Sequence, residues 1–114
     1  MGTASANNIP GARQMSVSSI DAQGNLLLFG GWGYIGPPFG RLNDLWNFNT
    51  NSNQWTWLGG SNSINNNGTY GTMGTSSSSN IPGARRMGIS WTDDDGKFWI
   101  FGGYGMMQMI AWDY

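Results

Sequence analysis

The sequence repeats itself at an interval of 72 residues, and this repetition constrains the fold more than any other feature. Residues 1–33 and 73–105 are identical at 18 of 33 aligned positions, without a gap. The words "NIPGAR" and "FGG" occur in the same order in both copies. Repeats of this kind pack on their neighbours to form an array. We therefore divide the chain into a first repeat, residues 1–72, and a second, truncated repeat, residues 73–114.

Each repeat contains short runs of strand-forming residues that are separated by turn residues. These runs are residues 13–20, 25–31, 43–49 and 54–59 in the first repeat, and 85–92, 97–103 and 109–114 in the second. Short turns between consecutive runs favour antiparallel hairpins. The run "NLLLFGG" is continuously apolar, which is typical of a strand buried on both faces. The sequence therefore predicts an all-β chain of seven strands without a helix.

The order of these features resembles the kelch motif, the unit of a β-propeller blade. The matching segments are Pro10-Gly11-Ala12-Arg13, Phe29-Gly30-Gly31, Asn43-Asp44-Leu45-Trp46 with Phe48, Trp55, Pro82 to Arg85, Phe101-Gly102-Gly103, and Trp112 with Tyr114. The interval exceeds the roughly 50 residues of a usual kelch repeat, and the excess lies in the stretch 59–80, rich in Gly, Ser and Asn. The resemblance implies blades that are four-stranded antiparallel meanders, and an incomplete propeller in this chain.

The residues that carry the resemblance are expected to serve the scaffold. They are Arg13, Gly30, Gly31, Trp46, Trp55, Arg85, Gly102, Gly103 and Trp112. Glycine pairs permit backbone conformations and close approaches that a side chain would block. The tryptophans are expected to fill the space between packed sheets, and the arginines to tie strand ends to backbone carbonyls.

The composition argues against several classes of function. The chain has no Cys and no His, which removes thiolate nucleophiles, imidazole bases and nearly all transition-metal sites. A net charge of −1 supplies no basic surface for nucleic acid. No apolar run is long enough to span a bilayer. We therefore expect no catalytic residue, cofactor or metal, no nucleic-acid or membrane partner, and no enzyme activity.

Two short motifs invite a functional interpretation that their surroundings do not support. The segment "GWGYIG" at 31–36 fits the spacing of a dinucleotide-binding loop, but Pro37 and Pro38 follow where that site needs a helix. The segment "DDDG" at 93–96 lacks the spacing and the Glu of a calcium loop, and the first repeat has "DAQG" there. A hairpin turn is the better interpretation of both Asp-to-Gly segments.

The loops of a meander predict where a binding site would lie. The short turns 21–24 and 50–53 fall at one end of the first sheet, and the long loops 32–42 and 59–80 at the other. The long-loop end carries the candidate binding residues Trp32, Tyr34, Phe39, Arg41, Tyr70 and Tyr104. Aromatic residues, glycine and asparagine with an arginine are typical of recognition loops. The alternative is that these aromatic residues merely cap the sheets.

Fewer than two complete repeats leave apolar sheet faces without a neighbour. We expect the partner to be a further copy of the chain, in the simplest case three chains in a six-bladed ring, or neighbouring repeats of a longer parent protein. A protein or glycan ligand remains a second hypothesis. Met1 aligns with Met73 inside the linker between repeats, as expected of repeats excised from a longer array or of a gene that begins inside a duplicated array. The low Lys content, the lack of Cys and the similarity to long bacterial repeats favour an extracellular or cell-surface location for such a parent.

Overall fold

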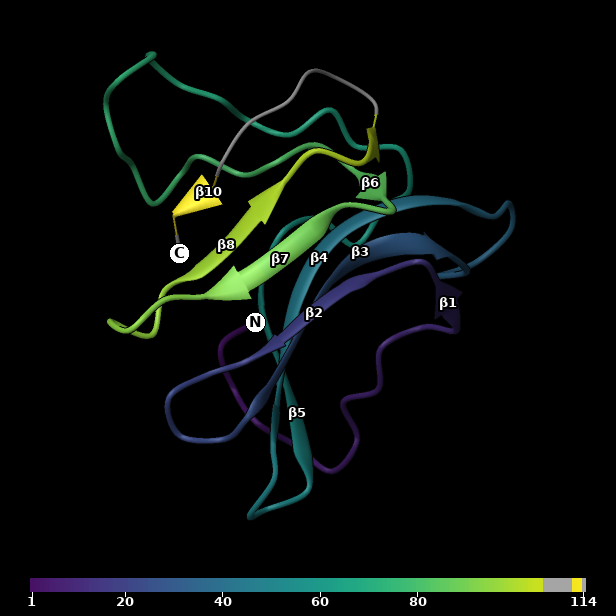
Figure 1. Ribbon diagram of the computed structural model, residues 1–114. Coiled ribbons are helices and arrows are strands. Elements are labelled where there is room, and N and C mark those ends of the chain that lie inside the picture. Colours follow the sequence, from purple (N-terminus) through teal and green to yellow (C-terminus); the bar gives the residue numbers. More distant parts are fainter. Residues whose placement is uncertain (106–111, 114) are drawn as a thin grey trace.

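The computed structural model describes residues 1–105 and 112–113, and these form antiparallel sheets without a helix (Figure 1). The largest sheet contains β1 (Arg13–Gln14), β2 (Val17–Ile20), β3 (Leu26–Gly33), β4 (Gly40–Asn49) and β5 (Gln54–Gly59). A second sheet contains β7 (Ile89–Thr92), β8 (Phe98–Phe101) and β10 (Trp112–Asp113), and a third pairs β6 (Arg85–Arg86) with β9 (Tyr104–Gly105). The all-β fold predicted from the sequence is confirmed.

The first repeat forms the predicted antiparallel succession of strands. Strands β2, β3 and β4 each pair with the next strand along the chain, and β5 forms the edge of the sheet. The sequence expected one strand over 13–20 and another over 85–92, and both are interrupted. Met15 and Met87 adopt positive φ angles of 59° and 61°, which are incompatible with an extended strand and separate β1 from β2 and β6 from β7.

The hairpin between β3 and β4 is tighter than the sequence suggested. Pairing continues from Gly31 opposite Leu42 to Gly33 opposite Gly40, so that only residues 34–39 form the loop. Trp32 and Arg41 were predicted to lie in a long loop but are cross-strand partners. This correction places their side chains at fixed positions on a sheet.

The double glycine of the first repeat lies where β3 passes close to the second repeat. Gly30 and Gly31 have φ angles of 63° and 105°, and the ladder with β4 shifts register between Phe29 and Gly31. A Cβ atom on Gly30 would lie 2.8 Å from the carbonyl oxygen of Arg85. Glycine is required there both for the backbone conformation and for the approach of β6.

The hydrophobic core lies between the first and second sheets. Val17, Leu27, Phe29 and Leu45 of the first sheet pack with Phe98 and Ile100 of the second, and Leu58 lies against this cluster. Strands β2 and β7 run side by side (Figure 1). Ser19 and Thr92 join them through their hydroxyls at 2.6 Å, and the Ser90 hydroxyl donates to the Ser18 carbonyl at 2.8 Å.

The expectation that the apolar strand of the first repeat is buried on both faces is wrong. Leu27 and Phe29 are buried, whereas Leu26 alternates with them and is 41% exposed. The physical reason is that the second sheet covers one face of the first sheet only. Trp46 and Trp55 pack edge to face with centroids 6.4 Å apart on β4 and β5, outside the buried cluster between the sheets.

A buried ion pair holds the start of the first repeat. Both terminal nitrogens of Arg13 donate to the Asp44 carboxylate, at 2.6 and 2.8 Å, and Trp46 Nε1 donates to the same carboxylate at 2.7 Å. Arg13 also donates to the carbonyls of Gly11 and Gly30, as predicted for this residue. The two charged side chains are only 5% and 6% exposed, so each depends on the other for compensation.

Arg85 is the equivalent arginine of the second repeat. Among the described residues it forms the hydrogen bonds to backbone carbonyls but no ion pair with a carboxylate. Arg85 donates to the carbonyls of Gly83 and Gly102, at 2.9 and 3.0 Å, as Arg13 does to Gly11 and Gly30. Arg85 is 3% exposed, and its Nη2 atom is buried without a hydrogen-bond partner within the described part of the chain. The predicted strand 109–114 lies outside the described residues except for β10, and the side chain of Trp112 lies outside them as well.

The two Asp-to-Gly segments are hairpin turns of the same design. Asp21 accepts hydrogen bonds from the N–H groups of Gln23 and Asn25, and Asp93 from those of Asp95 and Lys97. Trp99 Nε1 donates to the second carboxylate oxygen of Asp93 at 2.8 Å. The Trp99 bond, followed by the backbone bond from Lys97, lowers the pKa of Asp93 below its ordinary value.

The ends of the first sheet are arranged as the meander predicted. At the short-turn end, the Thr50 hydroxyl donates to the carbonyl of Gly24. At the other end lies the linking segment, residues 59–80, which joins the two repeats. Its Asn65 donates its N–H to the Arg41 carbonyl at 2.7 Å. The amide side chain of Asn43, which is 1% exposed, accepts from Ser61 N–H and donates to the Pro82 carbonyl. One buried amide therefore fixes both ends of this segment.

The free edge of β5 is covered by the first residues of the chain. Gly2 N–H donates to the Trp57 carbonyl at 2.7 Å, and Asn8 Nδ2 to the Trp55 carbonyl at 2.9 Å. Ser5 forms an isolated bridge with Trp55. These contacts shield an edge that would otherwise present unpaired backbone groups.

Replacing Asp44 by Asn is expected to destabilise the chain by about 3–5 kcal/mol, because Arg13 then keeps a buried charge without a counter-ion. Chemical denaturation followed by tryptophan fluorescence measures this. Asp94→Asn, at an exposed position, is the control and should change stability little. Equal losses in the two variants would contradict the importance of the ion pair.

Replacing Asp93 by Asn is expected to flatten the acid limb of the stability profile. The folded pKa of Asp93 is lowered, so its carboxylate contributes stability above the unfolded pKa, and this is lost as the pH falls through the folded pKa. Unfolding measured from neutral to strongly acidic pH should show a smaller decline in the variant. A decline equal to that of the parent would rule out this role.

Candidate functional site

Four side chains converge where the two repeats meet at the long-loop end. Trp32 lies near the end of β3 and Arg41 near the start of β4, while Arg86 lies in β6 and Tyr104 in β9. The guanidinium carbon of Arg41 lies 4.4 Å from the ring centroid of Tyr104 and 6.0 Å from that of Trp32. That of Arg86 lies 5.2 Å from the Trp32 centroid and 5.5 Å from that of Tyr104. Sheet pairing positions all four, since Trp32 is opposite Arg41 and Arg86 is opposite Tyr104.

This arginine–aromatic cluster joins the repeats electrostatically. Each guanidinium contacts one ring from each repeat, and such a contact contributes roughly 0.5–2 kcal/mol depending on how far it is desolvated. The rings of Trp32 and Tyr104 are therefore already engaged by cations of the same chain. Arg86 was not among the candidate residues from the sequence. The signal that could have identified it is the alignment of the repeats, in which Arg86 of the second repeat stands at the position of Gln14 in the first.

The other predicted binding residues separate into two places. Tyr34 and Phe39 flank the β3–β4 loop, are 42% and 59% exposed, and contact each other with ring centroids 5.2 Å apart. The Tyr70 hydroxyl instead accepts a hydrogen bond from Gly83 N–H at 3.3 Å within the linking segment. Of the six candidates, the structure thus brings together Trp32, Arg41 and Tyr104, and separately pairs Tyr34 with Phe39.

Another exposed apolar surface lies on the second sheet. The sequence analysis expected uncovered sheet faces but did not identify the residues of this one. We call it the β7/β8 outer face; its residues are Ile89, Trp91, Trp99 and Phe101. Ile89 is 61%, Trp91 44% and Phe101 45% exposed. Ile89 is opposite Phe101 and Trp91 opposite Trp99, and the two indoles stack with a 5° interplanar angle and centroids 6.1 Å apart. The signal was the alternation of large apolar residues in "GISWT", because alternate residues of a strand share one face.

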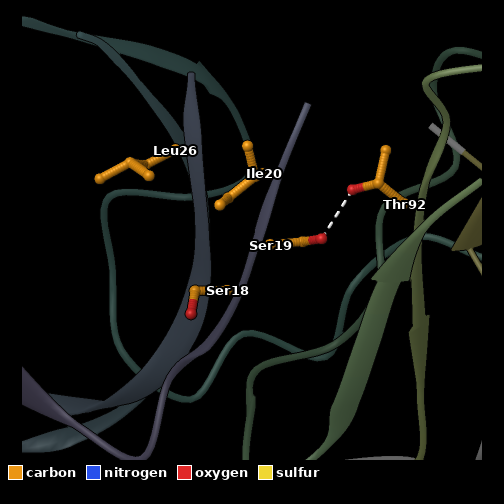
Figure 2. A pocket seen from close by; sticks show the side chains of 5 residues that line it. All are labelled: Ser18, Ser19, Ile20, Leu26 and Thr92. Atoms are coloured by element: carbon orange, nitrogen blue, oxygen red, sulfur yellow. Dashed lines mark hydrogen bonds between the residues drawn. The ribbon is translucent and has the colours of Figure 1, made fainter. Parts of the chain in front are cut away.

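The first sheet has a corresponding surface on the side away from the core. We call it the β2/β3 outer face; its residues are Ser18, Ile20, Leu26 and Leu28. Ile20 is opposite Leu26, and they are 58% and 41% exposed. Figure 2 shows a groove lined by Ser18, Ser19, Ile20, Leu26 and Thr92, with Ile20 and Leu26 close together and the Ser19–Thr92 hydrogen bond beside them. Neither outer face contains an ionisable side chain.

The described residues contain no group of three or more His, Cys, Asp or Glu side chains that could hold a metal ion, and they form no helix able to cross a membrane. The segment "GWGYIG" runs from the end of β3 into the hairpin loop, without the helix that a dinucleotide site uses. Comparison with known protein families and with curated proteins finds no match for this chain.

Replacing Tyr104 by Leu is expected to lower the free energy of unfolding by about 1 kcal/mol, because the cation–π contacts with both arginines are lost. Tyr104→Phe keeps the ring and should retain most of the stability. Urea denaturation of the two variants side by side gives the comparison. An equal loss of stability in the two variants would show that the cation–π contacts of the Tyr104 ring do not stabilise the fold.

Proposed function

We propose that this chain is a non-enzymatic module for protein–protein interaction or assembly, built from kelch-type blades of a β-propeller. Three features support the kelch assignment. Strands β2 to β5 of the first repeat follow one another in antiparallel order, the glycine pairs depart from ordinary strand geometry in both repeats, and Arg13 and Arg85 make equivalent bonds to carbonyls. The adjacency of β2 and β7 fits the inner strands of neighbouring blades around a common axis.

The observation that carries the functional proposal is the pair of uncovered apolar sheet faces. Soluble chains rarely expose stacked tryptophans beside isoleucine and phenylalanine unless a partner covers them. Aromatic residues are also enriched at the centres of protein interfaces. The partner is a further repeat, either on other copies of the chain, as in a six-bladed ring of three chains, or in a longer parent protein.

Glycan binding is a second candidate, favoured by the exposed pair Tyr34 and Phe39. Aromatic faces stack on sugar rings, and this pair protrudes from a tight hairpin loop that a sheet holds in place. Trp32 and Tyr104 are less suited to stacking on a sugar ring, because the guanidinium groups of Arg41 and Arg86 already contact their rings. A glycan array comparing the parent chain with Tyr34→Ala tests this candidate, and an identical pattern for both proteins would reject it.

Replacing Trp91 by Asp is expected to abolish association of the chain, because a charge at the centre of the β7/β8 outer face cannot be desolvated without a partner. Size-exclusion chromatography with light scattering should show a concentration-dependent mass for the parent chain and the monomer mass for the variant. Ile9→Asp, at a 76% exposed position outside both faces, is the control and should associate like the parent. If the unsubstituted chain is monomeric at every concentration, assembly from copies of this chain is refuted, and only repeats of a longer protein are left as the partner.

A further inference from the structure

We infer that the two outer faces bind each other between copies of this chain, head to tail. The β7/β8 outer face of one copy packs on the β2/β3 outer face of the next. This inference rests on the proposed function and names both the partner and the surface that it uses. Three observations carry it: the repeat equivalence of the faces, the chemistry of the matching positions, and the hydrogen bonds that already join the repeats.

The first observation is that the uncovered faces are repeat equivalents of the covered ones. In the core, Val17, Ser19, Leu27 and Phe29 face the second sheet, and the residues 72 positions later are Ile89, Trp91, Trp99 and Phe101. The opposite side of that contact consists of Ser90, Thr92, Phe98 and Ile100, whose equivalents are Ser18, Ile20, Leu26 and Leu28. Each outer face thus corresponds to one side of the interface inside the chain.

The second observation is that the matched positions remain chemically compatible between copies. The core contact of Leu27 and Phe29 with Phe98 and Ile100 becomes a contact of Trp99 and Phe101 with Leu26 and Leu28. The hydroxyl pair Ser19 and Thr92 becomes Trp91 and Ile20, an apolar pair in place of a polar one. None of these positions holds an ionisable side chain, and the Asp93 carboxylate beside the β7/β8 outer face is already bonded to Trp99 Nε1. Apolar burial is therefore not opposed by an unpaired ion.

The third observation is that the polar contacts between the repeats have reciprocal donors and acceptors. The Ser90 hydroxyl donates to the Ser18 carbonyl inside the chain. Because serine occupies both positions, the Ser18 hydroxyl of one copy is matched to the Ser90 carbonyl of its neighbour. Met87 N–H donates to the Met15 carbonyl at 3.0 Å, and both methionines have positive φ angles. In the inferred contact between copies, the equivalent bond runs from the Met15 N–H of one copy to the Met87 carbonyl of its neighbour.

Pairing of identical faces does not satisfy these observations. A two-fold contact between two β7/β8 outer faces would reproduce none of the packing inside the chain and would leave both β2/β3 outer faces uncovered. A head-to-tail contact covers one face of each kind at every junction. Such a heterologous interface continues from copy to copy until rotation closes it into a ring.

Complementation between two blocked variants tests the pairing. Ile20→Asp with Leu26→Asp blocks one outer face, and Ile89→Asp with Trp91→Asp blocks the other; all four positions are exposed, so each variant should keep the fold, as checked by circular dichroism. Light scattering should give the monomer mass for each variant alone and twice that mass for their equimolar mixture. Ile9→Asp with Met73→Asp, at exposed positions elsewhere, should assemble like the parent.

The outcomes separate the two proposals. Association of the parent chain with no complementation in the mixture overturns the head-to-tail inference and leaves the assembly function standing. Dimers of either blocked variant alone also overturn it, because they require identical faces to pair. A monomeric parent chain overturns the inference and, with it, assembly from copies of this chain.

Disulfide trapping gives an independent measurement, since the chain has no cysteine. Ile20→Cys and Trp91→Cys occupy the repeat equivalents of Thr92 and Ser19. Mild oxidation of a mixture should link them as a heterodimer, far above any dimer formed by either variant alone. The chain carrying both Ser19→Cys and Thr92→Cys is the positive control, because the 2.6 Å hydroxyl contact should become an intramolecular disulfide. Linkage of Trp91→Cys to itself at an equal rate would overturn the inference.

Discussion

The packing of β2 and β3 against β7 and β8 is the constraint on which the rest of the structure depends. A strand directs alternate side chains to opposite faces, so one contact between two sheets buries only half of each apolar run. Phe29 and Ile100 are buried at this contact, while Leu26 and Phe101 on the same strands remain exposed. The glycine pair, the hydroxyl contacts between β2 and β7 and the arginine–aromatic cluster all lie along the same junction.

Local chemistry made much of the fold predictable from the sequence. The turns at Asp21 and Asp93 were predictable because a carboxylate there accepts hydrogen bonds from nearby backbone N–H groups. The irregular backbone at the glycine pairs was predictable because glycine readily adopts positive φ angles. The breaks at Met15 and Met87 could not be predicted, because methionine carries no preference for a positive φ. Their cause is tertiary, since β6 and β7 must pass close to the first sheet.

The candidate site was predicted less well, for a similar reason. Composition marked aromatic residues near the loops, but it gave no information on which rings meet a cation. Trp32 and Tyr104 are 72 residues apart in the sequence and meet because β6, which pairs with β9, packs against β3 and β4. Arg86 enters the same cluster from β6. The sequence analysis expected uncovered apolar faces but could not name their residues, because an apolar run indicates burial without indicating which face a neighbour covers. The two repeats also differ at Arg85, which lacks the carboxylate that Arg13 finds in Asp44 among the described residues.

The side chain of Asn43 has a consequence for how this repeat can change over time. It holds Ser61 and Pro82 together, so both ends of the linking segment are fixed to β4. Residues 71–79 of that segment are all exposed, and lengthening an exposed loop whose ends are already fixed costs little free energy. The residues that make the repeat unusually long therefore include a stretch where insertions and deletions disturb the fold least. Insertions or deletions there would give evolution a way to alter the surface of the array while the spacing of its sheets is inherited unchanged.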